Sequence, residues 1–551
     1  MTTLTRFSAR QGRHPLAAAL FAVAVLIALL AFWACDGGSS SPASPTPSPT
    51  AAPTGEPSGV PVTPPAGGPP AIDLASDSPL LTIYGGGSGD LRSDIPGMAA
   101  GDFNGDGFQD LLVGARFADG PDEAREDAGE AYVVFGGEQL PDSVDIAAGE
   151  QGLTILGGVN GGGLGFAAAA GDLNDDGIDD IIVAAPFAES RGIAYVVFGR
   201  AGLAGVVDLA AGQQDVALRG AGTGADLFGD SMDVGDLNGD GAPDLVVGAT
   251  FASDEARDAQ QVGAVYTFFG PLAPGALETE QGDHDAVLFA PDRLDELGDT
   301  VVVGDVNGDE IDDIIATAEA ADGPDNDRET AAEVHVLFGS PGLGGELHLA
   351  DGDADVSVYA AEDHDTLGFS LASGDLDGDG VDDIIMGARL ADGPDNRRDA
   401  AGEVYVLYGG DDLPASLDLA ESPADVTIFG ADTGDFLGSS EAVGDLDGDG
   451  ANELVLGTGF GQGPVNDRFV GGEARVVGPL PDSGVLDLDG DATLAAVYGV
   501  AGDGLGANLL ITDLDGDGLP ELAAVAASAP GAGGLAEAGR VYLVEGVMQP
   551  P

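Results

Sequence analysis

The sequence predicts an all-β protein, a seven-bladed β-propeller of four-stranded antiparallel blades that is closed by an N-terminal strand. Two observations predict this fold: an acidic loop motif recurs seven times, and each copy is followed by β-type apolar runs in the same order. Repeats of one size that carry one motif are typical of propellers and solenoids. The motif Gly-Asp-x-Asn/Asp-x-Asp recurs in steps of 70, 64, 69, 70, 70 and 68 residues, with its first Asp at Asp102, Asp172, Asp236, Asp305, Asp375, Asp445 and Asp513.

Three strand-like runs make up each repeat. A continuous apolar run follows the loop, as in LLVGA from Leu111, and indicates a strand buried on both faces. A β-branched and aromatic run comes next, as in AYVVFG from Ala131. A third run, as in LTILG from Leu153, closes six of the repeats, whereas the seventh run of this kind, LLTIYG from Leu80, precedes the first repeat.

The displaced run at Leu80 indicates a ring. An open solenoid would gain nothing from moving one strand to the N-terminus, and it would need polar caps at both ends. If this strand pairs with the last run, at 540–545, the first and last units close on each other and no sheet edge stays open there. We therefore expect the propeller to span about residues 79–546.

Composition narrows the classes of function. The chain has 551 residues with 18 basic and 96 acidic side chains, a net charge of −78, and all of the basic residues are Arg. Such a charge excludes nucleic acid as a partner, because a phosphate backbone would be repelled. Hydrophobic residues make up 44%, which is enough for a large core. The single Cys excludes an intramolecular disulfide.

The N-terminal region predicts export. Residues 1–35 carry three Arg and no acid, and an uncharged apolar stretch at 16–34 ends at Cys35, so we expect a signal peptide or a membrane anchor. The segment FWAC ending at Cys35 resembles a bacterial lipoprotein cleavage box, in which this Cys is lipidated; an uncleaved anchor is the alternative. A Pro-, Ser-, Thr- and Gly-rich linker is expected at 36–70 and the propeller at 71–551. Either tether places the protein outside the cytoplasm, at the cell surface or in the periplasm.

The acidic loops predict calcium sites. Side-chain oxygens recur at positions 1, 3, 5 and 9 of each loop, and hard oxygen ligands without His or Cys select Ca²⁺. These residues are Asp102, Asn104, Asp106 and Asp110; Asp172, Asn174, Asp176 and Asp180; Asp236, Asn238, Asp240 and Asp244; Asp305, Asn307, Asp309 and Asp313; Asp375, Asp377, Asp379 and Asp383; Asp445, Asp447, Asp449 and Glu453; Asp513, Asp515, Asp517 and Glu521.

Two other interpretations of these loops are weaker. An EF-hand needs a Glu at position 12, but that position is apolar in every loop. Simple Asx-rich turns would leave close carboxylates that repel by about 4 kcal/mol per pair at an effective dielectric near 20, a cost that a cation offsets. We expect up to seven Ca²⁺ ions, with the fourth site the weakest because Glu310 stands where the other loops carry Gly.

The repeats resemble the FG-GAP repeats of the integrin alpha-subunit propeller. The resemblance rests on the loops, on Leu227-Phe228-Gly229 and Leu367-Gly368-Phe369 before them, and on Gly248-Ala249-Thr250 and Ala184-Ala185-Pro186 after them. It implies a seven-bladed propeller, calcium in the hairpin between the first and second strands of a blade, and an adhesion or scaffold role. It also implies that a backbone carbonyl at position 7 completes each site, at Phe108, Ile178, Ala242, Ile311, Val381, Ala451 and Leu519.

The same resemblance places the loops between the second and third strands on the opposite face. Those loops hold six arginines, which could form a broken basic ring for an acidic partner or glycan, or could neutralise neighbouring Asp residues: Arg125, Arg257, Arg328, Arg397, Arg398 and Arg468. The His residues show no metal-ligand or triad spacing, so we expect no enzyme and no catalytic residues.

The function that we expect is a surface-tethered, calcium-binding module for a protein or glycan ligand. One alternative is an enzyme that uses loops at the central channel, and two converging carboxylates with perturbed pKa values at the channel mouth would favour it. Another is a subunit of an envelope assembly, for which an exposed apolar patch would be the sign.

Overall fold

The computed structural model describes residues 70–548 except 88–90, 92–96, 121–123, 223–225, 258, 325, 327, 412, 464–465, 467, 491–492 and 536–537. The chain divides into two compact units, Met1–Pro61 and Val62–Pro551. The expected signal or anchor at 1–35, nearly all of the expected linker at 36–70 and the expected lipidation site at Cys35 lie outside the described residues. The described part of the chain contains no helix long and apolar enough to cross a membrane.

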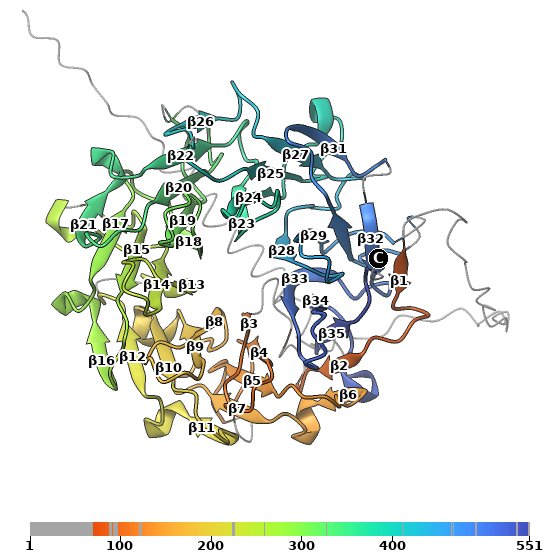
Figure 1. Cartoon of the computed structure of the whole chain (residues 1–551). Helices are drawn as coiled ribbons and strands as arrows, with labels where there is room; N and C mark the ends of the chain where they lie inside the picture. Colours follow the sequence, from red (N-terminus) through yellow and green to blue (C-terminus); the bar gives the residue numbers. More distant parts are fainter. Residues whose placement is uncertain are drawn as a thin grey trace, which may run out of the picture. The chain divides into compact units, whose positions relative to one another are not determined.

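Seven β-sheets stand around a central axis in the second unit (Figure 1). From the inner to the outer strand, blade 1 consists of β3 (Met98–Gly101), β4 (Asp110–Ala115), β5 (Glu130–Val134), β7 (Leu153–Leu156) and β11 (Gly205–Asp208). Blade 2 consists of β8 (Ala168–Gly171), β9 (Asp180–Ala185), β10 (Ile193–Val197), β12 (Val216–Arg219) and β16 (Gly275–Glu278). Blade 3 consists of β13 (Phe228–Gly235), β14 (Asp244–Ala249), β15 (Ala264–Phe268), β17 (Ala286–Phe289) and β21 (Gly345–His348).

The other four blades repeat this order. Blade 4 consists of β18 (Leu297–Gly304), β19 (Asp313–Ala318), β20 (Glu333–Leu337), β22 (Val356–Tyr359) and β26 (Leu417–Asp418). Blade 5 consists of β23 (Leu367–Gly374), β24 (Asp383–Ala388), β25 (Glu403–Leu407), β27 (Val426–Phe429) and β31 (Gly484–Asp487). Blade 6 consists of β28 (Ser440–Gly444), β29 (Glu453–Thr458), β30 (Glu473–Val477), β32 (Thr493–Tyr498) and β1 (Ala71–Asp73). Blade 7 consists of β33 (Leu505–Thr512), β34 (Glu521–Ala526), β35 (Arg540–Val544), β2 (Leu81–Tyr84) and β6 (Ser143–Asp145).

Short 3-10 helices lie between strands. They are η2 (Ile146–Ala148), η3 (Ala188–Ser190), η4 (Leu209–Ala211), η5 (Glu255–Arg257), η6 (Thr279–Gln281), η7 (Leu349–Asp351), η8 (Pro394–Asn396) and η9 (Ala532–Gly534).

The expectation of four-stranded blades is wrong, because every blade has a fifth, outermost strand. This strand runs parallel to the fourth strand, and the segment that forms it belongs to the next repeat around the ring. For example, β11 follows β10 of blade 2 in the chain and pairs with β7 of blade 1. The segments are two to four residues long, and their residues are mostly exposed or half-buried. They have too little apolar pattern to be recognised as strands, yet they cover a row of backbone groups that the fourth strand would otherwise leave open.

Closure of the ring by an N-terminal strand is confirmed. Strand β2 pairs antiparallel with β35, in the register Leu81 to Leu543, and parallel with β6 (Figure 1). A second N-terminal strand, β1, was not expected, and it adds in parallel to β32 of blade 6. The N-terminal part of the propeller therefore contributes one strand to blade 6 and one to blade 7.

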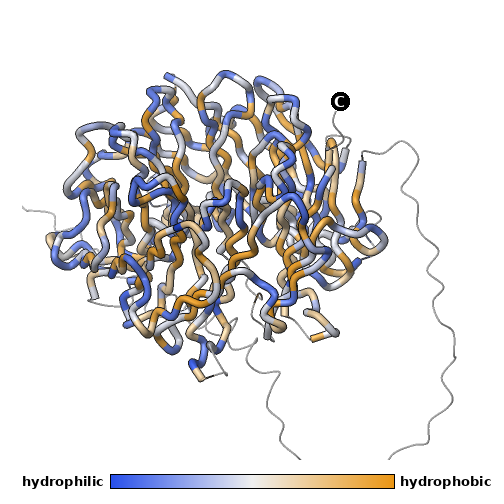
Figure 2. Tube along the Cα trace, turned by 60° about the horizontal axis from the view of Figure 1, so that its bottom comes forward, coloured by the Kyte–Doolittle hydropathy of each residue, from blue (hydrophilic) through white to orange (hydrophobic). Residues whose placement is uncertain are grey.

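The core lies between neighbouring blades and is built from the second and third strands. Every residue of β4, β9 and β14 is buried. Figure 2 shows hydrophobic stretches running through the body of the propeller and many hydrophilic residues in its loops. The Gly of the Gly-Ala element allows the blades to approach, because a Cβ atom at Gly248 would lie 2.0 Å from the carbonyl oxygen of Gly298 in the next blade.

One charged side chain interrupts this core. Glu441 on β28 pairs with Leu456, at the strand position that Leu371 and Leu509 occupy in the neighbouring blades. Both of its carboxylate oxygens are buried without a hydrogen-bond partner, since the nearby Ser370 hydroxyl donates to the Gly438 carbonyl at 2.9 Å instead. Burial raises the pKa of Glu441 to about 7.

We predict that Glu441→Leu stabilises the protein at pH 8 and has a smaller effect at pH 5. The folded pKa of Glu441 is raised, so its ionisation destabilises the fold as pH rises through about 7. The implied cost at pH 8 is roughly 3 kcal/mol. Thermal unfolding at both pH values measures the effect, and Glu441→Gln serves as the uncharged isosteric control. An equal gain at both pH values would show that ionisation is not the cause.

Candidate functional site

Each acidic loop forms the hairpin between the first and second strands of its blade, and it closes around the Asp at position 1. In the first loop, Asp102 Oδ1 accepts hydrogen bonds from the Gly105 and Asp106 N–H groups at 2.8 and 3.0 Å, and its Oδ2 accepts one from Gly107 at 2.8 Å. Gly105 and Gly107 have φ angles of 71° and 92°, which explains the two glycines of the motif. The backbone N–H groups of the loop therefore surround the position-1 carboxylate.

The fourth loop keeps the same geometry despite its substitution. Glu310 adopts a φ of 67°, and its N–H still donates to Asp305 Oδ2 at 2.8 Å, as the Gly does in the other loops. A non-glycine residue is strained in this left-handed region. The fourth loop therefore has the backbone strain for which we expected it to bind calcium most weakly.

The carboxylate at position 9 is buried at the start of the second strand. In the first loop, the two oxygens of Asp110 accept hydrogen bonds from the Phe103 N–H at 3.1 Å and the Gly136 N–H at 3.0 Å, which ties the loop to the end of the third strand. Burial, assisted by the neighbouring loop carboxylates, raises the pKa of Asp110 to about 7. The same pKa rise, to about 6 or 7, occurs at Asp180, Asp244, Asp313, Asp383, Glu453 and Glu521.

Position 3 divides the loops into two groups. In loops 1–4 it is an Asn whose amide donates to the position-9 carboxylate, as Asn104 does to Asp110 at 3.2 Å. In loops 5–7 it is an Asp, and among the described residues the groups of three or more acidic side chains with oxygens within 4.8 Å of one another lie in these loops: Asp375, Asp377 and Asp379; Asp445, Asp447 and Glu453; Asp513, Asp515, Asp517 and Glu521.

The seventh loop fits a divalent cation best. It brings together all four predicted side chains, and the Oε1 atom of Glu521 is buried without a hydrogen-bond partner. An acceptor that is buried and unpaired carries a desolvation cost that a cation in the loop would offset. Oxygen donors of this kind suit Ca²⁺ in particular, because its shell takes six to eight oxygens at variable angles.

Hydrogen bonds also join the loops of neighbouring blades. The Asp102 N–H donates to Asp179 Oδ2 of the second loop at 2.9 Å, and the Asp236 N–H donates to Asp312 Oδ2 of the fourth-blade loop at 2.7 Å. Asp179 and Asp312 occupy position 8 of their loops, beside the buried position-9 carboxylate. The loops therefore form a connected series around one end of the ring.

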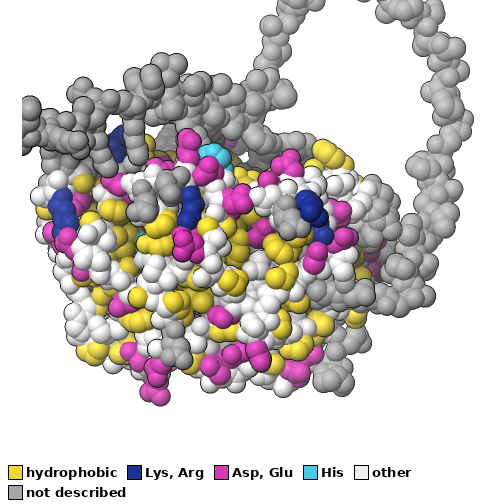
Figure 3. Space-filling view, turned by 90° about the horizontal axis from the view of Figure 1, so that it is seen from above, with side chains coloured by type: hydrophobic (Ala, Val, Ile, Leu, Met, Phe, Trp, Pro, Cys, Tyr) yellow, Lys and Arg dark blue, Asp and Glu magenta, His cyan; other side chains and the backbone are white. Residues whose placement is uncertain are grey.

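The opposite rim carries arginines, but they are paired. Five of the six arginines in the predicted basic ring form ion pairs with acids on or just after the fifth strand of their blade: Arg125 with Asp208 (2.7 Å), Arg257 with Asp351 (2.6 Å), Arg328 with Asp418 (2.6 Å), Arg398 with Asp487 (2.6 Å) and Arg468 with Asp73. Figure 3 shows Arg side chains beside acidic ones along one rim and mainly acidic side chains along the other. These contacts favour neutralisation of neighbouring acids over a free basic ring.

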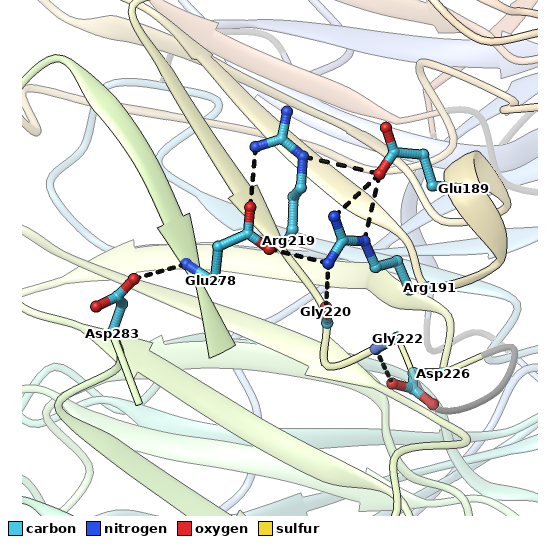
Figure 4. A network of polar contacts seen from close by, with 8 residues as sticks. All are labelled: Glu189, Arg191, Arg219, Gly220, Gly222, Asp226, Glu278 and Asp283. Atoms are coloured by element: carbon cyan, nitrogen blue, oxygen red, sulfur yellow. Dashed lines mark hydrogen bonds and ion pairs between the residues drawn. The ribbon is translucent and has the colours of Figure 1, made fainter. Parts of the chain in front are cut away.

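The second blade has its own version of this contact. Arg191 binds Glu278 at 2.9 Å and Glu189 at 3.0 Å, and Arg219 binds Glu278 at 3.5 Å (Figure 4). The shared acid, Glu278, ends the fifth strand of blade 2, so the contact joins a loop of one repeat to a segment about 90 residues later. In the seventh blade the equivalent acid is Asp145, whose buried Oδ1 has no hydrogen-bond partner.

Carboxylates also converge where the innermost strands of blades 3 and 4 begin. Asp230 on β13 and Asp299 on β18 lie near Glu296 and Glu319. Burial raises all four pKa values, that of Asp230 to about 6 and that of Glu296 to about 7; repulsion by neighbouring carboxylates adds to the rise at Asp230, Glu296 and Asp299, and Arg116 and Arg389 oppose it. Converging carboxylates with perturbed pKa values are the feature that would favour an enzyme. Sequence analysis did not identify this group of carboxylates. The signal in the sequence is that Asp230 and Asp299 occupy the strand position that Phe369 occupies in blade 5.

The fold and its loops thus define a seven-bladed β-propeller with a ring of acidic hairpins. The family model for the FG-GAP repeat matches residues 96–134, 164–197, 228–268, 367–407 and 505–544, so the chain contains FG-GAP repeats. The matches fall in blades 1, 2, 3, 5 and 7, and blades 4 and 6 have the same five-stranded sheets.

Known proteins share parts of this chain. The phosphatidylinositol-glycan-specific phospholipase D of Mus musculus is 26% identical over 411 residues, which cover 70% of this chain and 46% of the relative. The integrin alpha-5 of Xenopus laevis is 34% identical over 158 residues, 28% of this chain and 14% of the relative. The V. cholerae biofilm matrix protein Bap1 aligns over 84% of this chain and 90% of its own with 13% identity and a TM-score of 0.34. The chain spans less than half the length of the curated relatives named here.

The relatives correct one expectation. The absence of catalytic His spacing led us to expect no enzyme, but the relatives include a phospholipase D, which is an enzyme. The exclusion is therefore wrong. Its physical weakness is that it considered His-based motifs alone, whereas the structure brings carboxylates together at the inner strands.

Proposed function

We propose that this protein is an exported, surface-tethered propeller that binds Ca²⁺ in its acidic loops and presents its rims to a protein or glycan ligand. The observation that carries the calcium proposal is the seventh loop, with four convergent acidic side chains and the unpaired, buried Glu521 Oε1. The integrin alpha-5 relative supports a binding role, and the apolar segment ending at Cys35 supports a tether, by lipidation or as an uncleaved anchor.

The residues that would hold the ions are those at positions 1, 3, 5 and 9, with the position-7 carbonyl. Loops 5–7 place four acidic residues around each ion and loops 1–4 place three, because Asn replaces Asp at position 3 in the latter. Ligand charge tunes calcium affinity in oxygen sites, so loops 5–7 are expected to bind more tightly.

Metal analysis tests this proposal. We predict at least four Ca²⁺ ions per chain after dialysis against millimolar calcium, and one ion fewer in Glu521→Gln, which removes the charge of a ligand at constant size. Glu280→Gln changes an exposed acid outside the loops and should leave the count unchanged. Fewer than four ions, or equal counts in Glu521→Gln and the unaltered protein, would contradict the assignment.

A second candidate function is acid–base catalysis at the inner strands of blades 3 and 4. The converging carboxylates at Asp230 and Asp299 favour it, as does the enzyme among the relatives. A carboxyl group with a raised pKa can hold a proton near neutral pH, which a general acid requires. If an acid–base reaction catalysed by the protein proceeds unchanged in Asp299→Asn, Asp299 is excluded as its general acid.

A further inference from the structure

A cavity of about 180 Å³ lies in blade 5, apart from the calcium loops. It is bounded by the segment that enters β23, the loop between β24 and β25, and the first residues of β25. Four of its lining side chains are acidic and none is cationic. The polar lining residues are Glu362, Asp365, Asp392, Asn396, Glu403 and Tyr405.

The protein supplies a few hydrogen bonds to these carboxylates, including those from the Gly393 backbone to Glu403 and from the Ala400 N–H to Asp392 Oδ1 at 2.9 Å. The Glu362 N–H donates to Asp365 Oδ2 at 3.1 Å, and the Asn396 amide donates to Glu362 Oε2 at 2.7 Å. The Tyr405 hydroxyl donates to Glu403 Oε2 at 2.5 Å. Burial and the nearby Glu403 carboxylate raise the pKa of Asp365, which reflects negative charge gathered without a counter-ion in the lining.

Blade 6 repeats this arrangement with a cation inside it. The Asp432 N–H donates to Asp435 Oδ2 at 3.2 Å, and the Asn466 amide donates to Asp432 Oδ2 at 2.8 Å, as their counterparts do in blade 5. The third residue of β30 is Arg475, where β25 has Tyr405. The Arg475 guanidinium binds Glu473 Oε2 at 2.7 Å, and its charge partly offsets the effect of burial on Asp435, whose pKa is still raised to about 7.

The comparison between the two blades shows what the acidic cluster accepts. In blade 6 a guanidinium group of the chain itself binds the Glu of this cluster, whereas in blade 5 the uncharged Tyr405 occupies the same strand position and a cavity lies beside the acids. Among the described residues, groups of three or more acidic side chains close enough to share one metal ion lie in the acidic loops, and the blade 5 cavity holds no such group. A guanidinium group is a planar cation with several N–H donors, so it can donate hydrogen bonds to more than one of these carboxylates.

We propose that the blade 5 cavity binds a guanidinium group, supplied either by a small guanidino compound or by an arginine side chain of a protein ligand. This site goes beyond the proposed calcium function and does not depend on it. Asp365 and Glu403 provide the main charge, and Glu362 and Asp392 form the wall of the cavity.

Calorimetric titration of the calcium-saturated protein with ethylguanidinium tests the proposal. We expect saturable binding of one ligand per chain, weakened at least tenfold in Asp365→Asn and abolished in Tyr405→Arg, which places an internal guanidinium in blade 5 as Arg475 does in blade 6. Asp435→Asn is the matched control, because its cluster already holds Arg475, and it should bind as the unaltered protein does. Since calcium is saturating and counted separately, failure here is distinguishable from failure of the calcium proposal.

A second titration distinguishes the sources of the group. N-acetyl-arginine amide that binds at least tenfold more tightly than ethylguanidinium would identify a peptide-borne arginine, and equal affinities would identify the guanidinium group alone as the determinant. No saturable binding, binding unchanged in both Asp365→Asn and Tyr405→Arg, or displacement of the ligand by excess Ca²⁺ would overturn the proposal. In the reverse variant Arg475→Tyr, a second equivalent site is expected.

Discussion

A chain that starts at Gly87 is expected to melt at a lower temperature and to associate, whereas a chain that starts at Val62 should behave as the intact propeller. The shorter chain lacks β1 and β2. Strand β2 lies between β35 and β6, so its loss exposes the backbone edges of both strands. Such unpaired edges are templates for intermolecular β-pairing.

The expected loss of stability follows from burial. The side chains of Leu81 and Ile83 are 0% and 1% exposed, and fully burying such a side chain stabilises a protein by about 1.5 to 3 kcal/mol. The shorter chain also loses the pairing of β1 with β32 and the ion pair between Asp73 and Arg468. The expected total is several kcal/mol, a large fraction of the stability of a typical domain.

A third chain separates the two strands. A start at Ser78 keeps β2 and removes β1, so it should lose less stability than the start at Gly87 and stay monomeric. Differential scanning calorimetry and light scattering on the three chains measure both effects. Equal melting temperatures and monomeric behaviour for the starts at Val62 and Gly87 would contradict the role of β2 in closing the ring.

The ring and its closure could be predicted because they depend on patterns that are strong in one sequence. Each second strand is a continuous apolar run beside an acidic loop, and the displaced run at Leu80 has a unique place in the count. The fifth strands could not be predicted, because a segment such as Leu417–Asp418 has two residues and becomes a strand only when the fourth strand offers it an edge. That edge is a property of the assembled blade.

The candidate sites also differ in whether they depend on a local sequence pattern or on the assembled fold. The acidic loops are local in sequence, so the residues proposed to bind calcium could be named one by one. The carboxylates at the inner strands of blades 3 and 4 and the blade 5 cavity combine side chains from different elements: Asp299 lies on β18 and Glu319 directly after β19, and Asp365 and Glu403 are separated by about half of a repeat. The position occupied by Tyr405 in blade 5 and Arg475 in blade 6 could have been compared from the sequence, but its meaning depends on the cavity.

Removal of calcium is expected to have the largest effect on stability. At ten times its dissociation constant, each ion adds about 1.4 kcal/mol, so seven independent sites would add roughly 10 kcal/mol. The hydrogen bonds between loops of adjacent blades, such as that from Asp102 to Asp179, spread the effect of each loop to its neighbour. Chelation should therefore lower the melting temperature of the whole propeller in a single transition.

The pH dependence of this effect has a definite sign. In the metal-free protein the position-9 carboxylates have raised pKa values of about 6 or 7, so their protonated forms stabilise the fold below that range and this stability is lost as pH rises through about 7. Calcium requires the deprotonated carboxylates, so its stabilisation grows over the same interval. The difference in melting temperature between calcium and chelator should be small at pH 5 and large at pH 8. Calorimetry in calcium, in chelator and in magnesium measures it, with magnesium expected to stabilise less because it prefers a tight octahedral shell. A melting temperature that is indifferent to chelator at pH 8 would contradict both the sites and their role in the fold.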